Sequence, residues 1–338
     1  MVAIEELSAS DERWVGFCAQ NPETTLFQSP EWSEIIRETY DFSLRVLLAT
    51  QSGTVVGGLP FAHIEDFRGP RRVALAFADN VEPLPIHLWP EFEKHLTAES
   101  LPWTTRTLCK PTDASQSSKV VAQHHAVHLP STFAEAEAAF NIKHKQKWRQ
   151  SMRAGVTHRI DTSLDGLRVF YELHAETRKF KHGLMPQPFV FFEAIHRRFF
   201  PENGFLLIAE HQEAPVAAMF FLSYGSTLYY KFSASSLSSL SLRPNNLLIT
   251  KAIEMAIERG YKKLDLGISD TEGLIGFKER IGGRASDVYS AVYNPREKTK
   301  AVAEVERAFG EITNALTAED VPLGYAKRGG EILYRFFT

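Results

Sequence analysis

The sequence predicts an α+β protein made of two domains of the same kind. Its 338 residues exceed the usual size of a single hydrophobic core, which favours two domains. Two stretches, residues 47–61 and 207–221, also read as one hairpin, with apolar strands on either side of a short polar turn. Aligned without a gap, they place Ala49 on Ala209. This repeat indicates that one αβ unit is used twice.

The composition is typical of a globular protein that does not bind polyanions over its whole surface. Hydrophobic residues make up 44% of the chain and charged residues 23%, and the formal net charge is -3. A basic binding surface must therefore be local. Residues 1–11 carry acids and no apolar segment, no apolar run approaches the length of a membrane span, and Cys18 and Cys109 form no metal or redox motif. We therefore expect a cytoplasmic protein without a transmembrane segment.

The first predicted domain, residues 1–139, opens with two helices. The second of them begins at Ser29-Pro30-Glu31, which supplies an N-cap, a proline at the first helical position and an acid in the first turn. The first copy of the hairpin follows. The remaining patterns predict helices after residue 11, at 30–39 and at 91–96, and strands at 72–77, 105–109 and 120–128.

The second predicted domain, residues 140–298, mixes helices with strands that are antiparallel at first and then partly parallel. It begins with a basic helix, residues 140–153, which stops at Gly155. The tail, residues 299–338, is predicted to hold one more helix and a final apolar strand at 332–337. The placement that we consider for this tail is packing against the first domain. The other predicted elements are strands at 156–160, 205–210, 216–224, 226–234 and 263–268, and helices at 164–179, 189–199 and ending at Gly260.

Several short motifs accompany this order of elements along almost the whole chain. They are residues 27–32, 148–156, 177–183, 229–235, 244–246, 265–267 and 276–278, the last followed by the glycine pair 282–283. Together, the order and the motifs resemble the tandem acetyltransferase-like (GNAT) fold of the FemAB/FemX family and of related BioF-like acyltransferases. No heptad run is present, so the resemblance implies a form without a coiled-coil arm.

The resemblance implies amide formation, in which an amine attacks an activated acyl carbon and displaces a ribose hydroxyl or a thiol. In the FemX branch the donor is the acceptor end of an aminoacyl-tRNA, and the acceptor is an amine of a nucleotide- or lipid-linked peptidoglycan precursor. Such a protein works close to the membrane surface without crossing it. The BioF-like branch is presumed to use acyl thioesters, so the co-substrate would be acyl-CoA. Neither branch implies a further cofactor or a metal.

Lys278 and Phe277 are the predicted catalytic residues. The resemblance places a Phe-Lys pair near the transferred acyl group, where a fixed cation can stabilise a tetrahedral oxyanion or the leaving oxygen. Read from the sequence alone, Lys278 could instead begin a solvated charged turn. Phe277 either lines the channel that would hold the acyl group or belongs to the hydrophobic core.

The resemblance also implies residues that bind the acceptor. An acceptor-contacting tyrosine is expected at Tyr229 or Tyr230, which alternate faces along a strand, and we favour Tyr230. Asp79 would orient the acceptor amine, although a turn-forming Asp reads equally well. The lysine that the family uses for the acceptor is absent, because Ile36 occupies its place beside Arg37, and Arg37 is the remaining candidate.

Two basic groups are candidate phosphate sites. Arg149 and Arg153 are four residues apart on the basic helix and so share a face, which would suit the phosphates of RNA or of a nucleotide-linked precursor. The simpler interpretation of these two arginines is a helix surface exposed to solvent. Arg178, Lys181 and His182 form the second group, at a helix end where the FemX-like pattern, displaced by a few positions, has an acceptor-binding arginine.

The segment Arg243-Pro244-Asn245-Asn246 stands where acetyltransferases carry a glycine-rich loop for the CoA pyrophosphate. It contains no glycine, and Pro244 lacks an N–H donor, so it argues against ordinary acetyl-CoA binding. Asn246 is either a substrate-binding residue or part of a helix cap.

Three functions follow from these observations. The preferred one is a FemX-like aminoacyltransferase acting on a peptidoglycan precursor. The first alternative is an acyl-CoA-dependent N-acyltransferase acting on a small amine or sugar. The second is a non-catalytic GNAT-like binding module.

Overall fold

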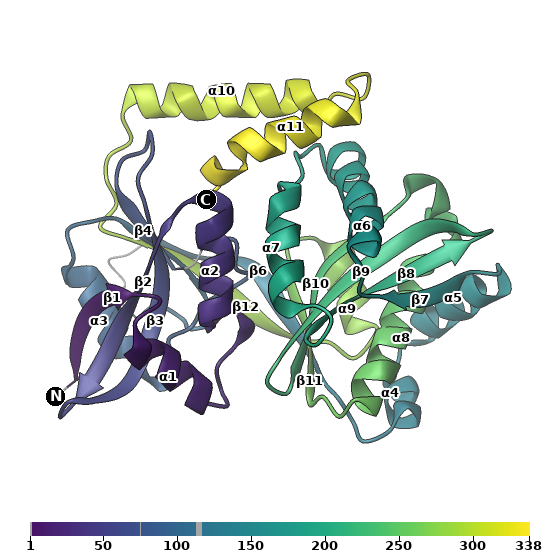
Figure 1. Cartoon of the computed structure of the whole chain (residues 1–338), viewed down its shortest axis with the longest axis horizontal. Coiled ribbons are helices and arrows are strands. Elements are labelled where there is room, and N and C mark those ends of the chain that lie inside the picture. Colours follow the sequence, from purple (N-terminus) through teal and green to yellow (C-terminus); the bar gives the residue numbers. More distant parts are fainter. Residues whose placement is uncertain (1, 75, 113–116) are drawn as a thin grey trace. The chain divides into compact units, whose positions relative to one another are not determined.

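The computed structural model describes residues 2–74, 76–112 and 117–338, and the chain divides into two compact units (Figure 1). Unit 1 comprises residues 1–124, 286–305 and 338, and unit 2 comprises residues 125–285 and 306–337. The first stretch of unit 1 ends at residue 124, about fifteen residues before the predicted domain boundary. The chain then returns from unit 2 to unit 1 at residue 286, which the sequence did not predict. These two crossings lie inside β6 (Ser117–His128) and β12 (Arg284–Tyr293), and the chain crosses again between residues 305 and 306 and before residue 338.

Unit 1 is a sheet in the order β1-β2-β3-β4-β5-β12, in which β4 and β5 are parallel and the other neighbours are antiparallel. Its second helix begins as predicted, because the Ser29 side chain accepts a hydrogen bond from the Trp32 N–H at 3.1 Å. The sequence patterns did not predict β1 and β12. The strand expected at residues 72–77 is observed as the shorter β4, and residue 75 of that range lies outside the described residues. The elements are β1 (Ala3–Ser8), α1 (Glu12–Gln20), α2 (Pro30–Tyr40), β2 (Ser43–Gln51), β3 (Thr54–Ile64), β4 (Arg71–Val73), α3 (Trp89–Ala98) and β5 (Trp103–Thr107).

Unit 2 carries strands in the order β11-β10-β9-β8-β7. The pairs from β7 to β10 are antiparallel, whereas β10 and β11 are parallel and are joined by helix α8, which makes a βαβ step. The elements are α4 (Phe133–Ala139), α5 (Ile142–Arg153), β7 (Thr157–Asp161), α6 (Leu164–Glu176), η3 (Thr177–Lys181, a π-helical turn), α7 (Phe189–Phe199), β8 (Gly204–His211), β9 (Ala214–Tyr224), β10 (Thr227–Ser235), α8 (Pro244–Glu258), β11 (Lys263–Ser269) and α9 (Glu272–Glu279).

The repeated hairpin is present in both units, as β2–β3 and β8–β9. In the first copy the pairing slips by one residue directly after Ala49, and in the second it slips directly after Ala209. The turn residues Ser52 and Gln212, which are also equivalent, both adopt a positive φ of 51°. The two hairpins therefore share their bulge and their turn, beyond the apolar pattern that the sequence shows.

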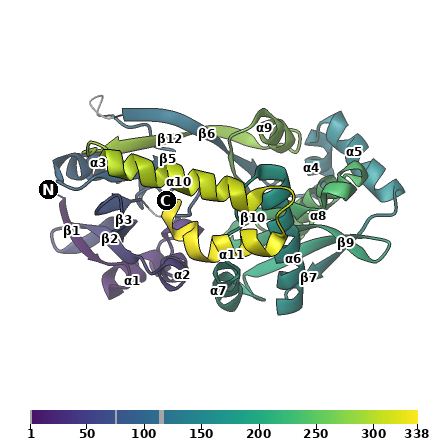
Figure 2. The ribbon, with the colours of Figure 1, turned by 90° about the horizontal axis from the view of Figure 1, so that it is seen from above.

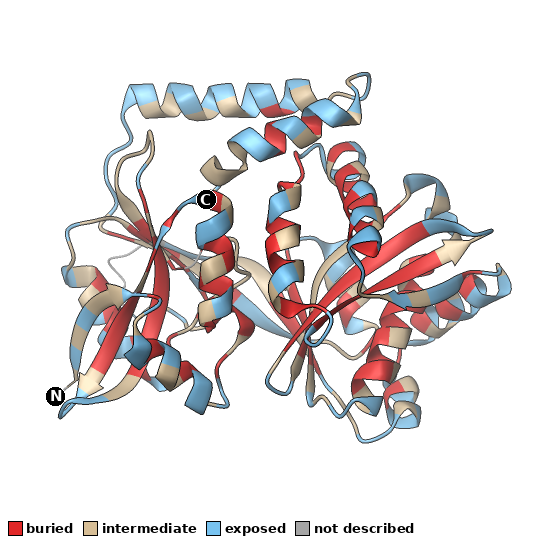
Figure 3. Cartoon of the chain, viewed as in Figure 1, coloured by how far each residue is buried: buried red, intermediate tan, exposed pale blue. Residues whose placement is uncertain are grey.

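Both faces of the central strands of unit 2 are covered, as the buried segments in Figure 3 show. Met219 and Phe221 on β9 join a core with the inward residues of α8, whereas Phe220 points the other way, toward Phe170 of α6. Trp148 anchors α5 in the first of these cores. This packing fixes α5, α6 and α8 against the sheet of unit 2.

The tail differs from the prediction. The expected strand at 332–337 is the end of helix α11 (Leu323–Leu333) and a short 3-10 turn, and residues 306–337 belong to unit 2. Helix α11 turns back along α10 (Lys300–Thr317), as Figure 2 shows. Gly330 permits the docking of α11, because a Cβ atom there would lie only 2.0 Å from the Pro186 carbonyl oxygen. A long-range contact, rather than the local apolar pattern, decides the conformation of this segment.

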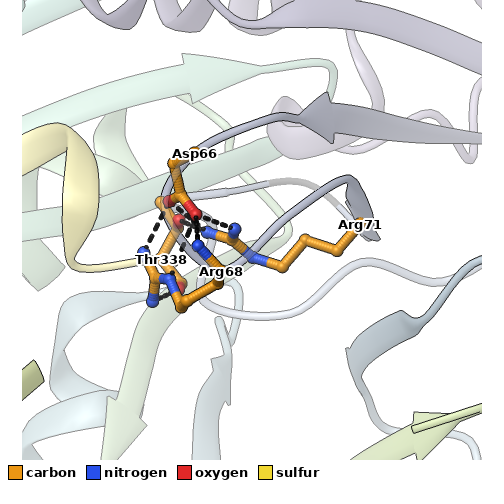
Figure 4. Close-up of polar contacts among 4 residues, drawn as sticks. All are labelled: Asp66, Arg68, Arg71 and Thr338. Atoms are coloured by element: carbon orange, nitrogen blue, oxygen red, sulfur yellow. Dashed lines mark hydrogen bonds and ion pairs between the residues drawn. The ribbon is translucent and has the colours of Figure 1, made fainter. Parts of the chain in front are cut away.

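Of the tail's last residues, only Thr338 belongs to unit 1, and its polar contacts with Arg68 and Arg71 are drawn in Figure 4. Its carbonyl oxygen accepts a hydrogen bond from Arg68 at 3.0 Å, and its hydroxyl accepts one from Arg71 at 2.9 Å. Both arginines also bind the Asp66 carboxylate. Burial opposes ionisation of Asp66, but Arg71 and Arg68 outweigh it and lower the pKa of Asp66 to about 2.

Candidate functional site

The ladder between β10 and β11 is short. Paired residues run only from Thr227–Lys263 to Tyr229–Asp265, although β10 continues to Ser235 and β11 to Ser269. Beyond that point the two parallel strands have no ladder with each other, and both of their carboxyl ends face the same edge of the sheet. In open α/β sheets this edge is where ligands bind.

Lys278 lies at this edge. It is only 3% exposed, and its Nζ donates hydrogen bonds to the carbonyl oxygens of Gly267, at 3.0 Å, and Ile268, at 2.7 Å. Both carbonyls belong to β11, just past its last residue paired with β10. Lys278 is therefore a buried cation positioned by two backbone carbonyls, and its interpretation as a solvated surface lysine is wrong.

The backbone around Lys278 is closely fitted. Gly267 adopts a φ of +67°, and its N–H donates to the Asp265 carboxylate at 2.9 Å. On the other side of the lysine, a Cβ atom at Gly283 would lie 2.6 Å from the Lys278 carbonyl oxygen. Two glycines and one carboxylate thus position the ammonium group. From the sequence alone, we could not assign a role to Asp265.

Phe277 and Tyr230 both border the core of unit 2. Phe277 is half-buried on α9 beside Lys278. Tyr230 is half-buried on β10, with its ring centroid 5.6 Å from that of Phe221, whereas Tyr229 is buried on the opposite face. Burial raises the pKa of Tyr230 to about 12, against a smaller opposing effect of a hydrogen bond with Ser233. Tyr230 is therefore neutral near pH 7 and can donate a hydrogen bond but not act as a base.

Arg178, Lys181 and His182 lie together at the end of α6, in and after η3. Burial, Lys181 and Arg178 lower the pKa of His182, and the charge of Asp270 opposes them. Because Asp270 directly follows β11, this interaction brings the cluster within electrostatic range of the edge where Lys278 lies. Arg178 also lines a cavity of about 210 Å³, with Leu184, Met185, Thr313, Tyr334 and Phe337.

Two buried polar contacts near this cluster had no signal in the sequence patterns. The Thr177 hydroxyl donates to the Ser235 carbonyl oxygen at 3.1 Å, which ties η3 to the end of β10. Lys179 is only 1% exposed, and its Nζ donates to the Ala318 carbonyl oxygen in the tail. The π-helical turn that holds Arg178 is thereby fixed from both sides.

Three other predicted residues lie on α5 and α8. Asn246 is buried, and its amide nitrogen lies 3.0 Å from Nδ1 of His144, whose Nε2 lies 2.9 Å from the Thr250 hydroxyl. These contacts give Asn246 a packing role between the two helices. Arg149 and Arg153 are both exposed, and Arg149 forms a long ion pair with Glu137 at 3.8 Å.

Asp79 and Arg37 lie in unit 1, whereas the other predicted site residues lie in unit 2. Arg37 is exposed on α2 and pairs with Glu34 at 2.7 Å. Asp79 is half-buried in the loop that follows β4. Within unit 2, the structure brings Lys278, Phe277 and the Arg178 cluster toward one edge of the sheet.

The comparisons with known proteins agree with this architecture. Residues 137–279 match a family described as an acetyltransferase (GNAT) domain. The chain is similar to the solved structure of FemX, with 16% sequence identity, a TM-score of 0.62, and coverage of 86% of this chain and 98% of that one. None of the curated proteins compared with the chain matches its sequence.

Two further solved structures are similar at a TM-score of 0.50. One is the C-terminal domain of a putative lysylphosphatidylglycerol synthetase from Agrobacterium fabrum, at 13% identity and with coverage of 74% of this chain and 84% of that one. The other is a tandem GNAT protein from the clavulanic acid biosynthesis pathway, at 11% identity and with coverage of 88% and 100%. The chain therefore has a GNAT acyltransferase fold, and more particularly a FemX-like one, which confirms the predicted fold class.

Two further properties concern the described residues only. Across residues 2–74, 76–112 and 117–338, none of the helices combines the length and the apolar character needed to cross a membrane. Within the same ranges, His, Cys, Asp and Glu side chains form no group of three that could hold a metal ion.

Proposed function

We propose that the protein is an aminoacyltransferase that moves an aminoacyl group from an aminoacyl-tRNA to an amine of a peptidoglycan precursor. The observation that carries the proposal is the buried ammonium of Lys278 at the end of β11, fixed on the Gly267 and Ile268 carbonyls. The likeness of the fold to FemX supports the choice of this reaction class.

The reaction is a nucleophilic acyl substitution. The acceptor amine attacks the ester carbonyl carbon of the donor and forms a C–N bond, and the carbonyl oxygen becomes an oxyanion. The C–O bond to the ribose then breaks, the carbonyl reforms as an amide, and the ribose hydroxyl leaves with the proton that the amine loses. Lys278 would stabilise the oxyanion or the leaving oxygen, an interaction that gains strength where water is excluded.

The remaining residues take supporting roles in the proposal. Tyr230, whose pKa burial raises to about 12, would donate a hydrogen bond from its hydroxyl to the acceptor. Arg178, Lys181 and His182 would bind acceptor phosphates, and Arg149 and Arg153 phosphates of the RNA. Asp79 and Arg37 are proposed as further acceptor contacts, and Phe277 as a wall beside the acyl group.

A panel of donors and acceptors tests the proposal. The donors are tRNAs charged with different amino acids and a set of acyl-CoAs, and the acceptors are nucleotide-linked and lipid-linked precursor peptides. The proposal predicts amide formation from at least one charged tRNA, with uncharged tRNA as the control. Amide formation from acyl-CoA alone would reject the tRNA donor and support the alternative below.

The alternative is an acyl-CoA-dependent N-acyltransferase acting on a small amine or sugar. The match of residues 137–279 to an acetyltransferase domain favours it. Against it, α8 begins at Arg243-Pro244 without a glycine-rich turn, and Pro244 offers no N–H to a pyrophosphate. Because a similar solved structure is named for lysylphosphatidylglycerol synthesis, vesicles of phosphatidylglycerol belong in the acceptor panel as well.

A further inference from the structure

The end of strand β10 is held by a threonine from another element of unit 2. Thr177 is the first residue of η3, the π-helical turn that follows α6, and its side chain is buried. Its hydroxyl donates a hydrogen bond to the Ser235 carbonyl oxygen at 3.1 Å and accepts one from the Ser235 N–H, also at 3.1 Å. One side chain therefore satisfies both backbone groups of the last residue of β10.

These two backbone groups lie on the side of β10 that faces β11. The next residue, Ser236, donates its N–H to the Val216 carbonyl oxygen of β9 at 2.9 Å. Because successive residues of an antiparallel ladder point their backbone groups alternately toward and away from the partner strand, those of Ser235 point away from β9. The neighbour of β10 on that side is β11. Thr177 thus occupies the place that β11 would take if the parallel ladder ran to the end of β10.

The end of β11 binds a side chain in a corresponding way. The ladder between the two strands stops at the pair Tyr229–Asp265. Past this pair, the Gly267 and Ile268 carbonyls of β11 accept hydrogen bonds from Lys278. Backbone groups at the ends of both strands are therefore satisfied by side chains of other elements, not by the neighbouring strand. Specific hydrogen bonds, rather than frayed strand ends, account for the separation of β10 and β11.

The contact of Thr177 differs from those of several other helical threonines. A threonine hydroxyl within a helix commonly donates to the carbonyl oxygen four residues earlier. The hydroxyls of Thr97, Thr250, Thr313 and Thr317 do so, at 2.8 or 2.9 Å. Thr177 instead binds a strand 58 residues further along the chain, from a π-helical turn of the kind that is frequent at functional sites. Its hydroxyl thus joins two elements, whereas theirs bind within one helix.

We infer that Thr177 is a positioning residue for the transfer site: its hydroxyl holds the end of β10 apart from β11 and keeps open the edge at which Lys278 lies. Without the hydroxyl, a buried N–H and a buried C=O of Ser235 would lose their partner, and the end of β10 would move to satisfy them. Thr177 directly precedes Arg178, so the same turn ties the proposed acceptor-binding arginine to β10. The inference deepens the proposed function and rests on it for the reaction that the open edge serves.

Three variants of the whole protein test the inference. Thr177→Val keeps the shape of the side chain but removes the hydroxyl. Thr177→Ser keeps the hydroxyl and removes only a methyl group. The matched control is Thr97→Val, which makes the same change on α3, where the hydroxyl donates to the Glu93 carbonyl oxygen of its own helix.

The first measurement is amide hydrogen exchange at Ser235, which needs no substrate. Its N–H should exchange about tenfold faster in Thr177→Val than in wild type, because a buried hydrogen bond is lost. The second measurement is the rate of amide formation in a single turnover with saturating charged tRNA and acceptor. This rate should fall about tenfold in Thr177→Val, since misplaced groups at a site slow the reaction. Thr177→Ser and Thr97→Val should match wild type in both measurements.

Unchanged exchange at Ser235 in Thr177→Val would overturn the inference, and so would exchange in Thr177→Ser as fast as in Thr177→Val. Faster exchange with a wild-type rate of amide formation would also overturn it, because the hydroxyl would then hold β10 without serving the reaction. Thermal melting checks that each variant is folded, and Thr177→Ala, which also lacks the hydroxyl, repeats both measurements if Thr177→Val does not fold. Wild type that forms no amide from any donor would reject the proposed function, whereas faster exchange confined to Thr177→Val would still support the hold of Thr177 on β10.

Discussion

The Nζ of Lys278 lies 2.7 Å from the carbonyl oxygen of Ile268. This contact places a buried cation where β11 has already parted from its pairing with β10. The carbonyls of Ile268 and Gly267 hold the ammonium in one position, and a cation fixed in this way can act on an oxygen that becomes negative. The geometry of β11 is therefore central to the proposed chemistry.

Gly267→Ala should lower both stability and amide formation. At a φ of +67°, a side chain costs about 1–2 kcal/mol, and relief of that strain would move a carbonyl that holds Lys278. Denaturant unfolding measures the first effect and the transfer assay the second. Gly273→Ala is the control, because no atom lies within 4 Å of a Cβ there, and its helical position favours alanine by up to about 1 kcal/mol. Equal stability of the two variants would contradict the prediction.

Tyr230 should stay protonated well above the usual pH of tyrosine ionisation. Burial raises its pKa to about 12, so the tyrosinate absorbance of wild type and of Tyr230→Phe should coincide up to about pH 11. The control Tyr325→Phe removes a tyrosine from an exposed position. Loss of amplitude near pH 10 in Tyr230→Phe would show that this hydroxyl is not desolvated.

His144 should make the protein less stable as the pH falls below about 6.5. Burial, Lys147 and Arg280 lower its folded-state pKa to about 4, so between about pH 4 and 6.5 the unfolded chain binds the extra proton. Denaturant unfolding from pH 7 to 5 measures this dependence. In His144→Gln the free energy of unfolding should depend less steeply on pH, by at most about 1.4 kcal/mol per pH unit. Identical slopes would mean that His144 protonates equally well in both states.

Gly330→Ala should weaken the docking of α11. The new Cβ would lie 2.0 Å from the Pro186 carbonyl oxygen, and overpacking of this kind costs about 1–3 kcal/mol. Gly324→Ala, on the same helix with nothing within 4 Å of its Cβ, is the control. Thermal unfolding compares the two. A Gly330→Ala variant as stable as Gly324→Ala would contradict the contact.

The sequence predicted those features of the fold that depend on local patterns. The hairpin repeat could be found because apolar alternation and turn residues are local, and the slips after Ala49 and Ala209 extend the match. Ser29 capped its helix as expected. The final helix could not be predicted, because the apolar run at 332–337 fits a strand equally well, and the contact of Gly330 with Pro186 spans over a hundred residues.

The candidate site was predictable only in part. The resemblance singled out Lys278, but its burial depends on carbonyls of β11 that it reaches only in the folded chain. Asn246 was proposed for substrate, whereas its contact with His144, on a helix a hundred residues earlier, gives it a packing role.

The most direct test of the account is the rate of amide formation in a single turnover, with saturating charged tRNA and acceptor. Lys278→Met removes the buried cation, and Lys262→Met makes the same change at an exposed position directly before β11. The account predicts that Lys278→Met loses at least about a hundredfold in rate, the range seen when one stabilising donor to an oxyanion is removed, whereas Lys262→Met keeps the wild-type rate. A folded Lys278→Met variant that forms the amide as fast as wild type would contradict it.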